Sequence, residues 1–428
     1  MEKKSQKKLL YSLIGLLLLI IIGYFLYSKK ANNTKEVVKQ DSTKIEQSTE
    51  KIDSNFLKAV IEDTSKNDKT SVIQTDSTLQ IEEDRRAGFS IQTFPPNAKR
   101  INIALIGTDG RIGHPGGHAD ANHIISILPD YGKIEIISIP RDTYVDCGYD
   151  DSTGLNKLTV YYLGAGRQAY LKKIAEIASL NSIPYYVEFG FSQALGILRW
   201  LGFNSSETLQ LLRSRKSFAI GDYQRVYNQA QFIRQNLISH FDLFNGPLKS
   251  VIIHGLLSLV NTNLTYDQIS SFLDELDKKN FKSSADNVII KVRPSLKVNF
   301  KVLDFSDPKS VEMLRNKLNL DEIAKQDTSA FQPKDFQLYL TKKLNKLLDE
   351  ASLDTAKSPA KVISKLSNYY DQKIWLQISD DELSLKYSKR FAELLINAYS
   401  KKNNIQKARA IKNAYIAEEE FFFAKHKK

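Results

Sequence analysis

The sequence is short of cysteine and of acidic residues. A single cysteine, Cys147, occurs among 428 residues. One thiol excludes an intramolecular disulfide framework and any cysteine-rich metal site. The length itself allows two or three domains with a sizeable core.

Acidic side chains are too few to balance the basic ones. The chain has 49 Asp and Glu against 61 Lys and Arg, which gives a formal net charge of +12. Such an excess favours an anionic partner, which could be nucleic acid, a lipid surface or a phosphorylated substrate. Nucleic-acid binding would also require basic residues interleaved with exposed aromatics and a cytoplasmic location. The N-terminal apolar run argues against this, so we expect no nucleic-acid partner.

Long uncharged runs are equally scarce, and the exception lies near the N-terminus. Residues 9–27, "LLYSLIGLLLLIIIGYFLY", carry no charge. As a helix this run spans about 28 Å, close to the hydrocarbon thickness of a bilayer. Lysines in residues 1–8 predict a cytoplasmic tail, so we expect a single-pass anchor in the cytoplasmic (inner) membrane with the bulk of the protein outside. A cleaved signal peptide is the alternative, but no small-x-small cleavage site follows the run.

The segment after this run has the composition of a linker. Residues 31–95 are rich in Ser, Thr, Asp, Glu and Lys, and their apolar residues are scattered. This composition predicts a flexible extracytoplasmic stalk over residues 28–99. The two prolines of "FPPNAKR" end it.

Strand and helix patterns alternate over residues 100–303. The predicted strands are 101–107, 123–128, 133–139, 184–189 and 284–292, and the predicted helices are 166–180 and 191–202. This alternation predicts an α/β fold, a layered α/β/α sandwich with a mixed central sheet.

The pattern becomes helical towards the C-terminus. After a linker at 304–334, apolar residues at helical spacing predict an α-helical accessory domain over residues 335–428. Such a domain could pack on the rest of the protein or bind a protein partner.

Charged residues gather where predicted strands end. Asp109 and Arg111 follow the first strand, Asp120 precedes the second, and the pair Arg141–Asp142 follows the third. The short "PDYG" connection requires the second and third strands to be antiparallel, so these side chains can meet at one edge of the sheet.

A second charged group lies at 211–235. Arg213 and Arg215 are two residues apart, whereas Asp222, Arg225 and Gln229 share one face of a predicted helix with Asp222 as its N-cap. Taken singly, each charge could be part of an ordinary ion pair. Together, arginines offer donor forks for phosphate oxygens and carboxylates offer ligands for Mg²⁺, which indicates a pyrophosphate site.

Four stretches in this order resemble motifs of the LytR–CpsA–Psr family: "LIGTDGR", "SIPRDTYV", "RSR" followed by "GDYQRVYNQ", and "LLSLVNTNLTYDQI". The resemblance covers about residues 100–303. It implies an extracytoplasmic enzyme that moves a phosphorylated glycopolymer from a polyprenyl pyrophosphate carrier to a peptidoglycan hydroxyl. A related pyrophosphatase activity is the other reaction it allows.

The resemblance also implies roles for particular residues. Asp109 and Asp120 would hold Mg²⁺, or alternatively Mn²⁺. The catalytic group would be Arg141, Asp142, Asp222 and Arg225, and the pyrophosphate would be bound by Arg111, His118, Arg141, Arg213, Arg215, Arg225 and Gln229. The lipid tail would occupy a hydrophobic tunnel, with residues 194–203 and 232–238 as candidate walls.

Two positions depart from the family pattern. His118 stands where the family usually has an arginine two residues before the metal-binding aspartate, and Asn228 replaces the arginine of an Arg-Gln pair. These changes keep open the alternative of a non-catalytic or regulatory protein that binds polyprenyl phosphates. His114, His118 and His123 also lie close in sequence, but their mixed spacing around two glycines is poor for zinc.

Overall fold

The computed structural model describes residues 94–95, 98–114, 116–214, 220–296, 298–317, 333–355 and 357–425. The predicted membrane anchor at 9–27 and nearly all of the predicted stalk at 28–99 lie outside these ranges. Within them, no helix combines the length and the apolar character needed to cross a membrane.

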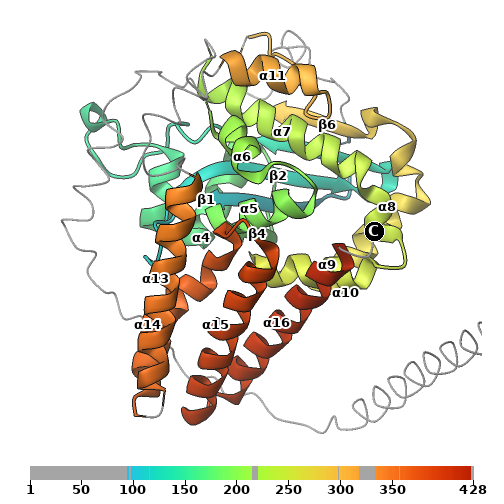
Figure 1. Cartoon of the computed structure of the whole chain (residues 1–428). Coiled ribbons are helices and arrows are strands. Elements are labelled where there is room, and N and C mark those ends of the chain that lie inside the picture. Colours follow the sequence, from blue (N-terminus) through green and yellow to red (C-terminus); the bar gives the residue numbers. More distant parts are fainter. Residues whose placement is uncertain are drawn as a thin grey trace, which may run out of the picture. The chain divides into compact units, whose positions relative to one another are not determined.

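The centre of the fold is a mixed six-stranded sheet with the order β5-β4-β1-β2-β3-β6 (Figure 1). Its strands are β1 (Ile101–Thr108), β2 (Ala119–Leu128), β3 (Lys133–Ser138), β4 (Tyr185–Phe189), β5 (Asn261–Thr262) and β6 (Val288–Val292). β1 pairs with β4 and β3 with β6 in parallel, and the other pairs are antiparallel.

Each face of the sheet is covered by helices, because successive side chains of a strand point to opposite faces and apolar residues occur on both. In β3, Ile134 and Ile136 belong to one buried cluster, which also contains Val226 of α7 (Asp222–Ser239). Ile137 and Ile139 belong to a second cluster on the other face, together with residues of α4 (Leu158–Ile177). The sheet is therefore buried on both sides, as expected for near-continuous apolar strands.

The sequence predicted the five longer strands, and the structure confirms them. β6 is shorter than expected because residues 285–287 form a 3-10 turn before it. The two-residue β5 carries no sequence signal of its own. α4 begins earlier than predicted and contains a kink at Gly166, whose φ of 76° departs from helical values.

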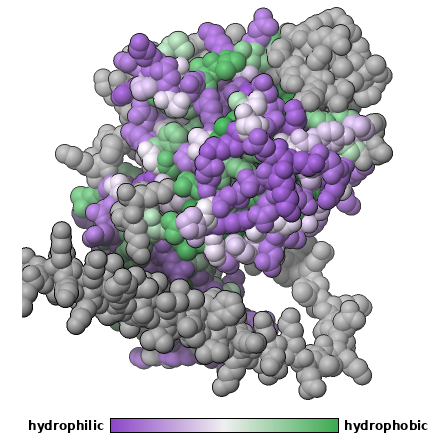
Figure 2. All heavy atoms as spheres, turned by 90° about the vertical axis from the view of Figure 1, so that its right-hand side faces the viewer, coloured by the Kyte–Doolittle hydropathy of each residue, from purple (hydrophilic) through white to green (hydrophobic). Residues whose placement is uncertain are grey.

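Further helices surround the sheet. They are α5 (Phe191–Trp200), α6 (Ser205–Arg213), α8 (Phe241–Asn245), α9 (Lys249–Leu259), α10 (Tyr266–Lys278) and α11 (Pro308–Lys317). α11 lies within the segment expected to be a linker. Seen from the right-hand side of Figure 1, the surface is mostly hydrophilic, and its hydrophobic side chains form small separate patches (Figure 2).

The C-terminal region is helical, as predicted. α13 (Pro333–Asp354), α14 (Pro359–Asp371), α15 (Asp381–Lys401) and α16 (Ile405–Lys425) pack in chain order (Figure 1). Their buried leucines and aromatics form one cluster with Ile252 and Leu259 of α9. The core of these helices is therefore shared with the α/β part of the chain.

Polar contacts also join the C-terminal helices to the α/β part of the chain. Arg199 of α5 donates a hydrogen bond of 2.6 Å to the carbonyl of Ile378 and lies 2.7 Å from the carboxylate of Asp381. Gln377 donates to the hydroxyl of Ser192 at 2.9 Å. Because both side chains at this last contact are buried, the bond satisfies groups that would otherwise be costly to bury.

Candidate functional site

The site is built on the loop between β1 and β2, which folds tightly on itself. The N–H of Asp109 donates to the carbonyl of His118 at 3.2 Å. A Cβ on Gly117 would lie 2.6 Å from the nitrogen of Gly110, and one on Gly110 would lie 2.7 Å from the Gly116 oxygen. The glycines of "GTDGR" and "GGH" are thus required for close backbone contact.

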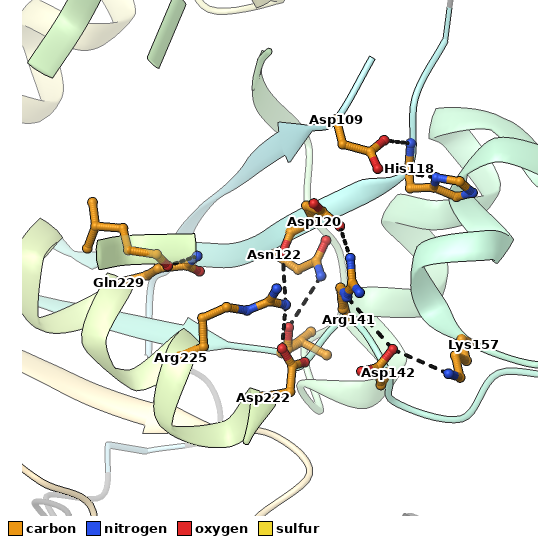
Figure 3. Close-up of polar contacts among 12 residues, drawn as sticks. Asp109, His118, Asp120, Asn122, Arg141, Asp142, Lys157, Asp222, Arg225 and Gln229 are labelled. Carbon is orange, nitrogen blue, oxygen red and sulfur yellow. Dashed lines mark hydrogen bonds and ion pairs between the residues drawn. The ribbon is translucent and has the colours of Figure 1, made fainter. Parts of the chain in front are cut away.

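This loop brings Asp109 and His118 together. The Asp109 carboxylate accepts a 2.6 Å hydrogen bond from the His118 N–H, and its other oxygen lies 3.4 Å from His118 Nδ1 (Figure 3). The hydrogen bond to Asp109 raises the pKa of His118 above its ordinary value, although burial alone would lower it. His118 thus contacts Asp109 through both its backbone N–H and its imidazole ring.

Asp120 and Arg141 form the central ion pair of the site. Arg141 Nη1 lies 2.6 Å from Asp120 Oδ1, across the ends of β2 and β3 (Figure 3). Burial would raise the pKa of Asp120, but the charges of Arg141 and Arg225 outweigh it and hold that pKa below its usual value. Asp120 is therefore ionised at neutral pH.

The other predicted carboxylates also face guanidinium groups. Asp142 lies 3.8 Å from Arg141 Nε and 3.6 Å from Lys157 Nζ. Asp222 forms an ion pair with Arg225, whose Nη2 also donates to the carbonyl of Asp120 at 3.3 Å. Ion pairs this enclosed persist because each charge is compensated by a partner.

One prediction on α7 is wrong in detail. Asp222 is not the N-cap, because Gly221 takes that place with a φ of 48° and Asp222 lies in the first turn. The left-handed φ favours glycine there. Gln229 donates to the carbonyl of Leu212 at 2.9 Å and lies 3.1 Å from His123 Nε2, so both ends of its amide are engaged within the protein.

Arg111 and Arg213 line the same cavity as Asp109 and Asp120. Arg213 is the last residue of α6, and the central carbon of its guanidinium group lies 5.5 Å from the ring centroid of Phe191. Arg215, the other arginine of "RSR", lies outside the residues that the structure describes.

A cavity of about 1130 Å³ runs from this charged group into an apolar interior. Its charged end holds Asp109, Arg111, Asp120, Arg213 and Arg225. Its apolar walls come mainly from α5 and α7, with Leu195, Leu198, Trp200, Phe232 and Leu237 among the lining residues. The prediction that residues 194–203 and 232–238 form walls of one hydrophobic cavity is confirmed.

The donor set can be compared with the needs of Mg²⁺. Asp109 and Asp120 both line the cavity. Among the described residues, no three His, Cys, Asp or Glu side chains gather into a group that could hold a metal ion unaided. Two carboxylates nevertheless suit Mg²⁺, which usually completes its shell with water and phosphate oxygens.

The structure adds Lys157, which the sequence did not single out and which pairs with Asp142. It also places His123, one of the three histidines that lie close in sequence, fully enclosed between Ser138 at 2.7 Å and Gln229. Burial lowers the pKa of His123 to about 4. His123 is thus neutral and structural, and no local motif distinguishes it from a ligand.

Comparison with known proteins gives one family match. The pattern of the LytR_cpsA_psr family matches residues 29–195. A protein of Bacillus mycoides (strain KBAB4) is 24% identical over 213 residues, which are 44% of this chain and 66% of the relative, just under two thirds of its length. A protein of Bacillus anthracis (strain CDC 684 / NRRL 3495) is 24% identical over 315 residues, which are 66% of this chain and 86% of the relative.

Both relatives carry the name polyisoprenyl-teichoic acid--peptidoglycan teichoic acid transferase TagU. Among solved structures, the crystal structure of B. subtilis TagV is 18% identical and has a TM-score of 0.38. That similarity covers 52% of this chain and 98% of TagV.

Proposed function

Since residues 29–195 belong to the LytR_cpsA_psr family, we propose that this chain transfers a phosphorylated glycopolymer from a polyprenyl pyrophosphate carrier to a hydroxyl of peptidoglycan. One observation supports this most directly: a cluster of arginines and aspartates lies at one end of a large apolar cavity. A pyrophosphate with an isoprenoid tail has the same division into a charged head and an apolar chain. The names of the two relatives are consistent with it.

The arginines would bind the pyrophosphate. Arg225 and Arg213 line the charged end of the cavity, and Arg141 holds Asp120 beside them. Guanidinium groups donate paired hydrogen bonds to phosphate oxygens and remain charged when buried. Asp142 and Asp222 would orient Arg141 and Arg225, since each lies against one of these guanidinium groups.

Asp109 and Asp120 would hold Mg²⁺, or Mn²⁺ in its place. When bound, the ion would neutralise charge that develops on the leaving phosphate. The acceptor hydroxyl would attack the phosphorus that bears the glycan, and its proton would pass to a carboxylate of the cluster. The bond to the bridging oxygen would break, and the polyprenyl phosphate would leave with the electron pair. The arginines would stabilise the added charge in the transition state.

We also propose that residues 9–27 anchor the protein in the cytoplasmic membrane with its bulk outside. The uncharged run and the four lysines that precede it in residues 1–8 support this orientation. A cysteine placed at residue 130 in a cysteine-free chain should react with an impermeant maleimide in intact cells, and protection until lysis would contradict the proposal.

The function can be tested with purified full-length protein, a polyprenyl pyrophosphate glycan and Mg²⁺. We expect metal-dependent cleavage of the phosphate bond, and its loss in Asp109→Ala and Arg141→Ala. Asp130→Ala is a matched control, because Asp130 is exposed in the turn that follows β2, at the end of that strand away from Asp120. Equal activity in all three variants would sink the proposal.

A binding or regulatory role is the second candidate. The observation that favours it is Asn228, which is buried and accepts a 2.7 Å hydrogen bond from Gln224, so it supplies no positive charge to the cavity. Tight binding of the lipid without turnover, even with a peptidoglycan acceptor present, would support this alternative.

A further inference from the structure

The C-terminal helices hold the loop between β1 and β2 in place. Gln372, at the end of α14, accepts a hydrogen bond from the N–H of Gly113 at 2.8 Å. Its amide nitrogen donates to the carbonyls of Arg111 and His114, both at 2.8 Å. A Cβ on Gly113 would lie 2.4 Å from the ring of Tyr369, so the loop also packs tightly against α14. The two parts are fixed relative to each other beside the charged end of the cavity.

α13 supplies part of the cavity wall at this junction. Four of its side chains line the cavity that also contains Asp109 and Arg111; they are Phe336, Gln337, Tyr339 and Lys343. These residues lie far beyond the segment 29–195 that matches the family. The wall they form is therefore a feature of this chain's own C-terminal helices.

Lys343 is placed between two aromatic rings. Its Nζ lies 5.8 Å from the ring centroid of Tyr339 and 5.9 Å from that of Tyr369. The side chain is half-buried, and no carboxylate in the described part of the chain pairs with it. A lysine that is partly desolvated and has no acidic partner can gain by binding an anion.

The neighbouring tyrosine adds a different kind of contact. Tyr339 is 54% exposed, so much of its ring remains open to a ligand. The electron-rich face of an aromatic ring attracts the polarised C–H groups on the flat face of a sugar, and the phenol can hydrogen-bond to hydroxyls. An isoprenoid chain would suit this place less well, because it would bury the ammonium group without an ionic partner.

We propose that α13 carries a subsite for an anionic sugar-phosphate or polyol-phosphate chain, formed by Lys343 and Tyr339 together with Tyr369 of α14. Arg111 lines the same cavity. The phosphate would bind the ammonium group, and the carbon skeleton would lie against Tyr339. This inference deepens the proposed function, on which it rests, by assigning the polymer end of the donor to the C-terminal helices. The lipid would lie in the apolar part of the cavity, against α5 and α7.

Two soluble probes separate this subsite from the pyrophosphate site. The full-length chain in detergent is titrated with a short glycerol phosphate oligomer and, separately, with geranylgeranyl pyrophosphate. We expect Lys343→Gln to weaken binding of the oligomer about fivefold to tenfold, as for the loss of one charge-assisted contact. Its affinity for geranylgeranyl pyrophosphate should not change. Tyr339→Ala should weaken oligomer binding in the same way, and its exposed side chain makes a folding defect unexpected.

Lys342→Gln is the matched control, because it removes the same charge from the exposed neighbouring position. Equal oligomer affinity in Lys342→Gln and Lys343→Gln would overturn the subsite. So would an absence of oligomer binding to the unchanged chain, or equally tight binding of a neutral dextran oligosaccharide. If the oligomer binds through Lys343 but geranylgeranyl pyrophosphate does not bind at all, the proposed function fails and the subsite stands.

Discussion

Gly255 on α9 packs so closely against Phe421 on α16 that a Cβ atom on the glycine would lie 2.4 Å from the phenylalanine Cβ. Phe421 in turn stacks on Trp200 of the cavity wall, with ring centroids 4.6 Å apart and planes at 17°. The close contact between the α/β part and the last helix thus depends on Gly255 having no side chain.

Gly255→Val should therefore separate α9 from α16. Overpacking at a backbone contact costs about 1–3 kcal/mol, so we expect the free energy of unfolding in urea to fall by this amount. Gly164→Ala in α4 is the control, because its new methyl group would meet no atom within 4 Å. Helix propensity predicts an unchanged or slightly increased stability for the control. Similar losses in both variants would contradict the packing argument.

Arg141→Lys tests whether the guanidinium fork is needed beyond its charge. Lysine keeps the positive charge but cannot contact Asp120 through one nitrogen and face Asp142 through another. Loss of a charge-assisted contact predicts a fall in kcat/KM of about 10- to 100-fold. Steady-state kinetics at saturating Mg²⁺ measure it, and a lysine variant with full activity would show that charge alone suffices.

His123 should make the fold sensitive to acid. Its pKa is about 4 in the folded protein because of burial, whereas an unfolded histidine titrates near pH 6.5. Between these values the unfolded state binds more protons, so stability should fall as the pH is lowered from about 6.5 to about 4, by up to roughly 3 kcal/mol.

Urea unfolding at a series of pH values measures this effect. His123→Gln removes the titrating group, so the free energy of unfolding should fall less between pH 6.5 and pH 4, whatever the substitution does to stability at pH 8. An equal fall in the variant would assign the effect to other groups.

Gln372→Ala should loosen the loop that carries Asp109 without touching the cavity. The variant loses hydrogen bonds to Arg111, Gly113 and His114. Because the loop then orders only on binding, we expect the Mg²⁺ concentration for half-maximal activity to rise about tenfold, while kcat at saturating metal changes little. Adding EDTA should abolish the activity of both proteins.

Asn345→Ala is the control for this effect. Asn345 makes its hydrogen bonds to Tyr387 and Arg390 within the C-terminal helices, so its loss should leave the metal dependence unchanged. A shift of equal size in both variants would indicate a general weakening of the helices.

The sequence predicted the sheet and much of the charged group for a common reason. The longer strands are rich in apolar residues, and the short turn at Pro129–Tyr131 makes β2 and β3 antiparallel. That topology brings Asp120 and Arg141 to the same edge of the sheet. Local pattern and simple topology were enough to place these residues together.

Gln372 and Lys343 could not be predicted in this way. Their positions depend on how α13 and α14 pack against a loop more than two hundred residues earlier, and that packing leaves no periodic signal in the sequence. The N-cap of α7 was misplaced by one residue for a different reason. Aspartate is the better capping residue, but the turn requires a left-handed φ that Gly221 supplies.

The tie between Gly113 and Gln372 spans 259 residues of chain. A ribosome delivers Gly113 long before Gln372, and domains form largely in the order of synthesis. A nascent or truncated chain would thus possess the arginines of the charged cluster while the loop between β1 and β2 still lacks its hydrogen bonds to Gln372. Completion of the last helices is then the step that turns a folded sheet into a finished site.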